Sequence, residues 1–282
     1  KSTVMRIMRE IIDPNADYAA SPFDDIRDYI SFVKNNYVVA FDNLSVLKGW
    51  MSDSLCRLST GSASLGGRRL YTNDSLASFV ACRPIIINGI PDIVERSDLM
   101  DRMIHILLPK IDAYEDDVIF WRKFNEVKPR IVGSLYSAIS CALKNWEGVK
   151  LDYMPRMSAF ARWVVAAEDA LSFPAGSFLR AYKNNRFSAN QTLLEFSPVG
   201  QAIFSLLKED TSYHGSYDDL YTSLLIHARR EGFPRSVGGL AAELRRLAPS
   251  MRQVGIDFFL NGRSRQGNQR GKTMVELRRR ED

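Results

Sequence analysis

The chain has 282 residues, of which 45% are hydrophobic and 25% charged, a composition typical of folded globular proteins. No apolar run approaches the roughly 20 residues that span a bilayer, so we expect no membrane-spanning segment. The first residues form a charged amphipathic pattern rather than a signal peptide, and the three widely spaced cysteines fit neither a disulfide framework nor a zinc site. These features predict a cytoplasmic protein.

The charge is unevenly distributed. The whole chain carries 38 basic and 33 acidic residues, a net charge of +5. Residues 229–280 alone contain thirteen basic side chains against four acidic ones, a local excess of nine positive charges. Such a field favours a polyanionic partner, which predicts nucleic-acid binding by this stretch. A solvated basic surface is the alternative.

The first 109 residues alternate between helical and strand-like patterns. Helical spacing of apolar residues predicts helices over residues 2–12, 21–36, 51–60 and 97–103. Short apolar, β-branched runs predict buried strands at residues 37–43, 84–89 and 104–109. Two further runs, 68–72 and 77–82, predict a β-hairpin.

The pattern changes after Pro109. Residues 115–147 and 155–190 have a helical period and no strand-like run. Three amphipathic helices and two extended segments follow, at 198–208, 216–231, 236–247, 255–261 and 272–278. Helices followed by a hairpin with a basic, glycine-rich tip are the order of a winged helix. The expected domains are therefore a core at 1–109, a helical linker at 110–192 and a nucleic-acid-binding domain at 193–282.

The opening Lys1-Ser2-Thr3 leads directly into a helix, as the last part of a P-loop does. There the lysine reaches the β- and γ-phosphates, the next hydroxyl ligates Mg²⁺, and the helix N-terminus faces phosphate. Asp42, at the end of the first predicted strand, is a candidate carboxylate for the same Mg²⁺. Asn88 ends a second strand, at the edge of the sheet where ligands bind in open α/β folds. Asp42 and Asn88 could instead cap turns, and the three residues of "KST" could be a chance match.

Two arginines, Arg96 and Arg102, flank the short predicted helix. An arginine that meets the γ-phosphate across a subunit interface accelerates hydrolysis by several orders of magnitude. The alternative is an ordinary surface role.

In this order the segments resemble the ATPase core of superfamily III helicases of the poxvirus-type and phage primase-helicase kind. The likeness is closer to ATP-binding proteins of phages and integrative elements. It covers residues 1–190 and is carried by "KST", "YVVAFDNLS", "SDSLCRLSTG", "RRLYTND" and "RPIIING". The resemblance implies an α/β P-loop ATPase core of the AAA+ or superfamily III type that binds ATP and Mg²⁺ and assembles as a homo-oligomer, as a ring. The glycine-rich half of the P-loop is not among these residues.

The resemblance also assigns roles to the residues that match its motifs. Lys1, Ser2 and Thr3 would bind the nucleotide, and Ser2 and Asp42 would hold Mg²⁺. Asn88 would position the attacking water or the γ-phosphate.

The catalytic base and the arginine finger are less well matched. The carboxylate that usually follows the metal-binding aspartate is Asn43 here, and an amide orients a water but does not accept its proton. Asp53 is a candidate replacement, although an aspartate in the first turn of a helix more often complements the helix dipole. Arg102 would be the arginine finger supplied to a neighbouring subunit, with Arg96 as second choice.

Single- or double-stranded DNA is the expected partner, through the residues at the start of the hairpin and in the winged helix. The candidate contacts are Arg68, Arg69, Ser236, Arg245, Arg263, Arg265, Arg270 and Lys272. Residues 236–247 would enter the major groove.

The sequence therefore predicts an ATP-dependent DNA helicase or translocase of a mobile genetic element, acting in replication with a primase domain or protein upstream. The alternative is a nucleotide-gated module that binds DNA and loads at an origin with little unwinding. A defence or signalling ATPase rests on fold analogy alone.

Overall fold

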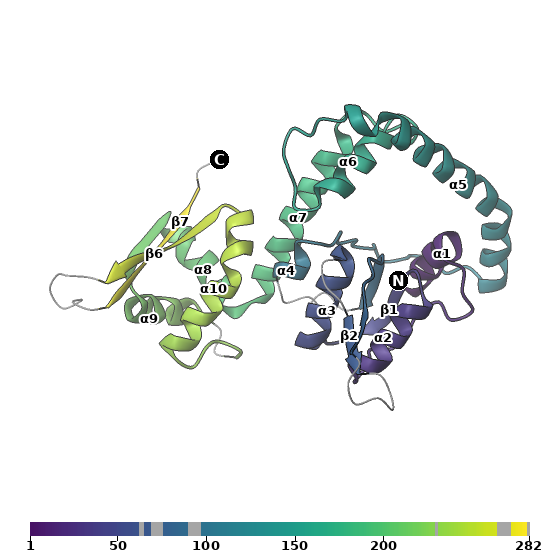
Figure 1. The fold of residues 1–282 in the computed structure, drawn as a ribbon. Coiled ribbons are helices and arrows are strands. Elements are labelled where there is room, and N and C mark those ends of the chain that lie inside the picture. Colours follow the sequence, from purple (N-terminus) through teal and green to yellow (C-terminus); the bar gives the residue numbers. More distant parts are fainter. Residues whose placement is uncertain (62–64, 69–75, 90–96, 229–230, 264–271, 281–282) are drawn as a thin grey trace. The chain divides into compact units, whose positions relative to one another are not determined.

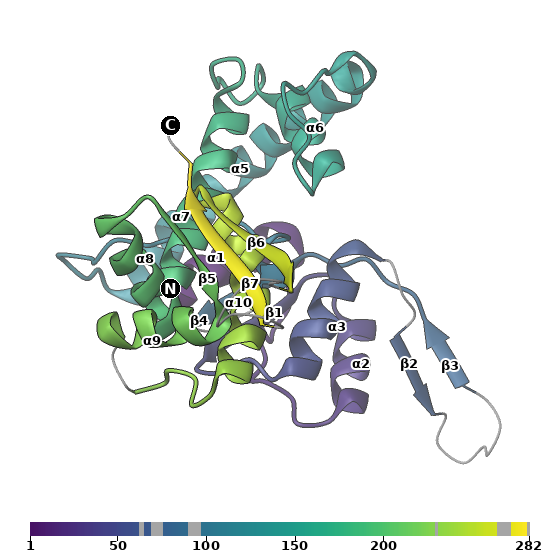
Figure 2. The ribbon, with the colours of Figure 1, turned by 90° about the vertical axis from the view of Figure 1, so that its left-hand side faces the viewer.

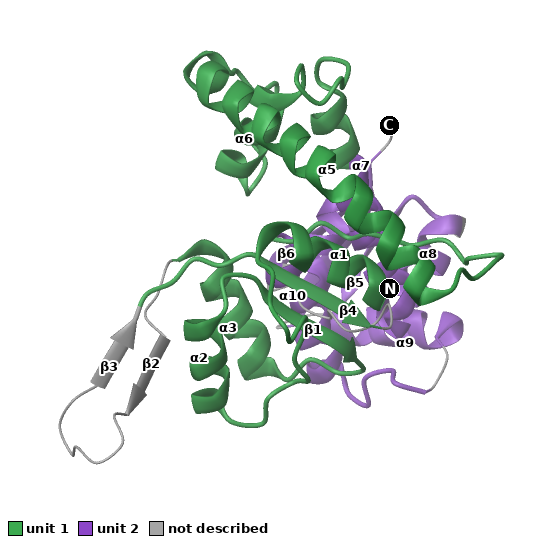
Figure 3. Ribbon diagram, turned by 90° about the vertical axis from the view of Figure 1, so that its right-hand side faces the viewer, with its two compact units in different colours: residues 1–93, 102–183 green, residues 94–101, 184–282 purple. Residues whose placement is uncertain are grey.

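The computed structural model describes residues 1–61, 65–68, 76–89, 97–228, 231–263 and 272–280; Figure 1 labels its elements. The chain divides into two compact units, residues 1–93 with 102–183 and residues 94–101 with 184–282 (Figure 3). The expected three-part division at residues 109 and 192 stays a prediction. Within the described ranges, each helix is too short or too polar to cross a membrane.

The first unit combines a small parallel sheet with helices. Its elements are α1 (Ser2–Ile12), α2 (Ile26–Asn35), β1 (Val39–Leu44), α3 (Gly49–Thr60), β2 (Leu65–Arg68), β3 (Leu76–Phe79), β4 (Ile85–Gly89), α5 (Asp117–Asn145), the 3₁₀ turn η2 (Trp146–Gly148), α6 (Ser158–Ala167) and the start of α7 (Ser177–Phe196). Strands β1 and β4 pair in parallel from Val39↔Ile85 to Phe41↔Ile87, and β2 and β3 pair as an antiparallel hairpin.

Aromatic rings cover the first strand. Phe41 is fully buried, and its ring centroid lies 6.0 Å from that of Phe23, 6.4 Å from that of Tyr29 and 5.9 Å from that of Phe32. Tyr29 and Phe32 come from one face of α2, so this amphipathic helix packs its apolar side onto β1. Rings at such separations add to the free energy gained from burial alone.

A buried arginine attaches α1 to the start of β1. Arg9 is 1% exposed and pairs with Asp13 at 2.7 Å. Its guanidinium also donates to the carbonyl oxygen of Val38 and, at 3.1 Å, to Oδ1 of Asn36. Asp13 in turn accepts the backbone N–H of Val38 at 2.8 Å. A guanidinium is costly to desolvate, and these acceptors compensate for its lost hydration.

The structure confirms most of the elements expected in the first unit and shifts two of them. The second helix begins at Ile26, and not at residue 21, because the carboxylate of Asp25 accepts the N–H of Arg27 at 2.7 Å and caps it there. The hairpin is present, but its first strand begins at residue 65 instead of 68, and residues 69–75 lie outside the described ranges.

The prediction of a third buried strand at residues 104–109 is wrong. These residues form neither helix nor strand, and Ile106 and Leu107 are 60% and 68% exposed. Among the described residues the parallel sheet contains β1 and β4 only. An apolar run becomes a strand only where another strand forms a ladder with it, and within the described ranges no strand pairs with residues 104–109.

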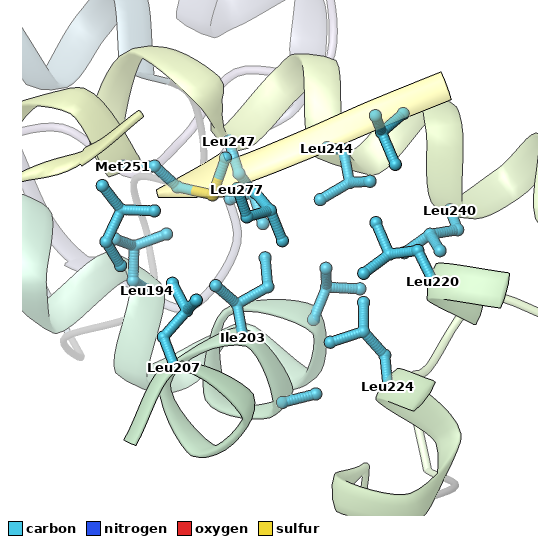
Figure 4. Close-up of a cluster of buried hydrophobic side chains, with 14 of the residues drawn as sticks. Leu194, Ile203, Leu207, Leu220, Leu224, Leu240, Leu244, Leu247, Met251 and Leu277 are labelled. Atoms are coloured by element: carbon cyan, nitrogen blue, oxygen red, sulfur yellow. The ribbon is translucent and has the colours of Figure 1, made fainter. Parts of the chain in front are cut away.

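The second unit is a helical layer with a three-stranded sheet. It contains α4 (Ser97–Met100), the end of α7, α8 (Pro198–Glu209), β5 (Ser212–Ser216), α9 (Tyr217–His227), α10 (Val237–Gln253), β6 (Ile256–Arg263) and β7 (Thr273–Arg279). The strands lie side by side in the antiparallel order β5-β7-β6 (Figure 2). Leucine, isoleucine and methionine side chains from α7 to α10 and β7 point into one core (Figure 4).

The three helices and two C-terminal strands of this unit are confirmed within a few residues. The third helix continues beyond the expected residue 247 to Gln253, through Pro249. The expected second helix ends at His227 rather than at 231. Strand β5 was not expected, because Ser-Tyr-His-Gly-Ser lacks the apolar alternation of a strand and pairs only through its backbone with β7.

We expect Arg9→Met to lower the free energy of unfolding by about 3 kcal/mol or more, because Asp13 and the carbonyl of Val38 lose their buried partner. Denaturant unfolding of the chain measures the change. Arg27→Met, at an exposed position of α2, is the matched control and should change stability by less than about 0.5 kcal/mol. Equal stability of the Arg9 and Arg27 variants would show that the network does not hold the helix.

Candidate functional site

Three of the predicted site residues meet at the carboxyl edge of the parallel strands. Ser2 begins α1, Asp42 lies near the end of β1 and Asn88 near the end of β4. The hydroxyl of Ser2 donates to Oδ1 of Asp42 at 3.2 Å, and the amide of Asn88 donates to the same carboxylate oxygen. The Asn88 amide also lies 3.4 Å from the Ser2 hydroxyl. Residues 86 positions apart are therefore brought together, and we name them the Ser2–Asp42–Asn88 cluster.

The other nucleotide-binding candidates lie beside this cluster. The ammonium of Lys1 donates to the carbonyl oxygen of Gly89 at 2.7 Å, at the end of β4. This places a positive charge at the carboxyl edge of the sheet, where α1 also begins. Thr3 is exposed in the first turn of α1.

Tyr18 is a site residue that the sequence analysis missed. Its hydroxyl donates to Oδ2 of Asp42 at 3.1 Å. This hydrogen bond, with some burial, raises the pKa of Tyr18, while the nearby Arg6 guanidinium opposes the shift. The phenol therefore keeps its proton at neutral pH and remains a donor. Both oxygens of Asp42 are thus held by side-chain donors from α1, β4 and the loop before α2.

A short backbone bridge positions Tyr18. Ala20 pairs in parallel with Phe41, and its N–H donates to the carbonyl of Ala40 at 2.9 Å. The backbone N–H of Asp42 donates to the carbonyl oxygen of Ala20 at 3.2 Å. No periodic pattern in residues 13–20 signals this bridge, which is why the sequence does not reveal the neighbouring tyrosine.

Asn43 has a backbone conformation that explains its identity. Its φ is +56°, in the left-handed region, where asparagine is among the few tolerated non-glycine residues. Its side chain is exposed, and its backbone N–H donates to Oδ1 of Asp42 at 2.9 Å. A longer carboxylate such as glutamate would be strained at this position.

The donor set fits a magnesium nucleotide. Mg²⁺ takes oxygen ligands, and in phosphate-transfer sites it often uses only one or two carboxylates beside phosphates and water. The Ser2 and Asp42 oxygens lie 3.2 Å apart, close to the roughly 3 Å that separates neighbouring ligands of an octahedral Mg²⁺. In the described part of the chain no three His, Cys, Asp or Glu side chains cluster as a metal site. The Ser2 and Asp42 oxygens therefore fit an Mg²⁺ whose other ligands are phosphate oxygens and water.

The remaining catalytic candidates are not part of the cluster. Arg102 is half-buried and its guanidinium lies 3.9 Å from the Cys56 sulfur of α3 in the same unit, so a role as arginine finger stays a prediction. Asp53 lies in the first half of α3 and is likewise not among the contacts of Asp42 described above. Arg96 lies outside the described residues.

Helix α10 carries two of the nucleic-acid candidates, Ser236 at its N-cap and Arg245 on an exposed face. Ser236 caps the helix, with its hydroxyl accepting the N–H of Gly239 at 3.1 Å. The outward face then begins with small residues, Gly238, Gly239 and Ala242, and continues with Arg245 and Arg252, all of them exposed. Ser236 and Arg245 are nine residues apart, so they lie on opposite sides of the helix. Of these two candidates, Arg245 belongs to the outward face and Ser236 does not.

The other DNA candidates are placed only in part. Lys272 lies 3.7 Å from Asp218, in the first turn of α9. Arg263 ends β6 opposite Thr273, and Arg68 ends β2 opposite Leu76; their side chains are not described. Arg69, Arg265 and Arg270 lie outside the described residues.

Comparison with protein families gives two matches that together span most of the chain. Residues 1–186 match the family model described as "Actinomycete integrative conjugative element replication protein". Residues 199–282 match the one described as "AICE RepA C-terminal domain". Neither a curated protein nor a solved structure matches the chain.

We expect Asp42→Ala to lower the pKa of Tyr18 towards the ordinary value near 10, because the substitution removes the acceptor that holds its proton. NMR titration of the chain with ¹³C-labelled tyrosine measures this pKa, and Tyr18→Phe assigns the resonance. Asp28→Ala, an exposed position on α2, should leave the titration unchanged. An unshifted Tyr18 in the Asp42 variant would contradict the hydrogen bond.

Proposed function

The chain belongs to the family of replication proteins of actinomycete integrative conjugative elements, and we propose that it acts there as an ATP-dependent DNA translocase or helicase. In this proposal the first unit is a P-loop ATPase core of the AAA+ or superfamily III type. Residues 199–282 form a winged helix that binds DNA. The protein works as a homo-oligomeric ring, with a primase as its upstream partner.

The single observation that carries the ATPase proposal is the Ser2–Asp42–Asn88 cluster. A hydroxyl at the start of a helix, a carboxylate at the end of one parallel strand and an amide at the end of the next are the side chains that an Mg²⁺-nucleotide needs. Lys1 adds a cation at the same edge. A structural role alone does not require this combination at the edge where α/β proteins bind ligands.

In the proposed mechanism each of these residues has a separate role. Mg²⁺, bound by Asp42 and Ser2, would neutralise phosphate charge. Lys1 would bind the β- and γ-phosphates, and the helix N-terminus at Ser2 would donate its N–H groups to them. Asn88 would orient the attacking water. Tyr18 would hold the carboxylate of Asp42 in place through its hydroxyl, as partners of metal ligands do.

Asn43 favours slow hydrolysis. Phosphoryl transfer has a loose transition state, so orientation and charge neutralisation matter more than early proton removal. The exposed amide of Asn43 would help to orient water but cannot act as the base. The same residue supports the second candidate function, a nucleotide-gated module that loads on DNA with little unwinding.

The order of elements in the second unit supports the winged-helix proposal. Three helices precede an antiparallel hairpin, and β5, between α8 and α9, pairs with the last strand. The small residues on the outward face of α10 would let a DNA backbone or groove approach closely. The arginines that follow them on this face would contact phosphates.

We expect Asp42→Asn to reduce ATP hydrolysis by about 10²-fold or more, because the variant loses the negative ligand of Mg²⁺. Phosphate release by the full natural polypeptide, with and without DNA, measures the rate. Asp28→Asn, an equal charge change at an exposed position of α2, is the matched control and should retain wild-type activity. If the wild type binds Mg²⁺-ATP and does not hydrolyse it under either condition, the translocase proposal fails and the nucleotide-gated module replaces it.

We expect DNA binding to weaken steeply with salt, and Arg245→Ala combined with Arg252→Ala to reduce the slope of log K against log[salt] by about two. Each phosphate contact that is lost removes nearly one unit of slope. Fluorescence anisotropy with labelled DNA from low to physiological salt measures both slopes. Lys208→Ala, exposed on α8, controls for charge loss elsewhere in the unit. An unchanged slope in the double variant would place the DNA contact on another surface.

A further inference from the structure

A surface pocket lies between α1 and α5, one helical turn along α1 from the Ser2–Asp42–Asn88 cluster. It is an open surface depression of about 740 Å³ that is lined mostly by exposed side chains. Arg6 lines it from α1, four residues and about 6 Å along the helix from Ser2. The other lining residues come from the first turns of α5: Asp117, Val118, Trp121, Arg122, Asn125 and Glu126.

The aromatic wall of this pocket is held rigidly. The rings of Phe120 and Phe124 meet Trp121 edge-on, with centroid separations of 5.4 and 5.5 Å. The Arg6 guanidinium lies over the indole at 4.1 Å from its centroid. A second contact fixes the same two helices further along, where Lys128 pairs with Glu10 at 3.0 Å. These contacts hold Trp121 beside α1, with the Arg6 guanidinium over its indole.

The charges in the pocket identify the kind of ligand it fits. Arg6 and Arg122 are balanced by Asp117 and Glu126, so the pocket has no net charge to attract a phosphate. What remains is an aromatic surface with hydrogen-bond donors and acceptors around it. The amide of Asn125 supplies one donor and one acceptor, a pair that matches the amino group and ring nitrogen of adenine. A neutral heteroaromatic base fits this environment better than an anion or an aliphatic group.

We propose that this pocket binds the base of the nucleotide whose phosphates lie at the Ser2–Asp42–Asn88 cluster. The inference rests on the proposed nucleotide binding and adds to it the site of the base. Trp121 stacks on the base, which takes the place of the Arg6 guanidinium over the indole, and Asn125 recognises the edge of the base. Asp117 and Glu126 are acceptors for an exocyclic amino group, so the pocket selects an amino-bearing base, adenine, over its 6-oxo counterpart, hypoxanthine.

Calorimetric titration of the full natural polypeptide with Mg²⁺-ATP and with Mg²⁺-tripolyphosphate tests the assignment. Trp121→Ala should weaken ATP binding by about 5- to 150-fold, the loss expected for one base–aromatic stack, and leave tripolyphosphate binding unchanged. Trp121→Phe should restore most of the ATP affinity because it keeps a stacking ring. Tyr136→Ala, an exposed aromatic position on the same helix, is the matched control and should bind both ligands as the wild type does.

A second variant keeps the test decisive if Trp121→Ala unfolds. Asn125 is exposed, so Asn125→Ala should fold normally and reduce the preference for ATP over ITP, which carries the 6-oxo base. An unchanged preference, or equal loss of ATP and tripolyphosphate affinity in the Trp121 variants, would place the base elsewhere while nucleotide binding stands. Failure of the wild type to bind either ligand would instead overturn the proposed function, and this inference with it.

Discussion

The ion pair between Arg9 and Asp13 holds the end of α1 against the start of β1, within a hydrogen-bond network around the buried guanidinium. Because α1 is a rigid rod, fixing Arg9 also fixes Ser2, seven residues and about 10 Å earlier. The Ser2 hydroxyl is thereby held beside Asp42, and Arg6 beside Trp121. This charged pair thus fixes the position of the Ser2 hydroxyl and of the Arg6 side chain together.

The polar cluster itself is arranged by the backbone. Parallel pairing of β1 and β4 brings the ends of both strands to one edge, and the bridge at Ala20 occupies the other side of β1. Asp42 therefore receives donors from both neighbouring segments. A carboxylate that is held at both oxygens has little freedom to rotate, which is the condition for presenting a defined ligand geometry to a cation.

The sequence predicts features that depend on local pattern. The positions of Asp42 and Asn88 follow from apolar runs that end in polar residues, and the helices of the second unit from their periodicity. Tyr18 could not be predicted, because a loop bridge brings it to Asp42, and residues 104–109 were misassigned because hydrophobicity does not reveal whether a strand has a partner. Asn43 is a third residue whose explanation needs the structure. Its left-handed backbone conformation explains why an asparagine stands there, whereas the comparison of motifs shows only that the usual carboxylate is absent.

Residues 104–108, the apolar part of the misassigned run, also bear on association between chains. Ile104, Ile106 and Leu107 are exposed, and burial lowers the pKa of His105, so this segment carries no charge at neutral pH. Short, uncharged, β-prone segments are the ones that form intermolecular sheets. Pro109 and Lys110 follow directly, and a residue without an N–H next to a positive charge interrupts such association. Pro109 and Lys110 therefore oppose intermolecular pairing of this exposed apolar segment.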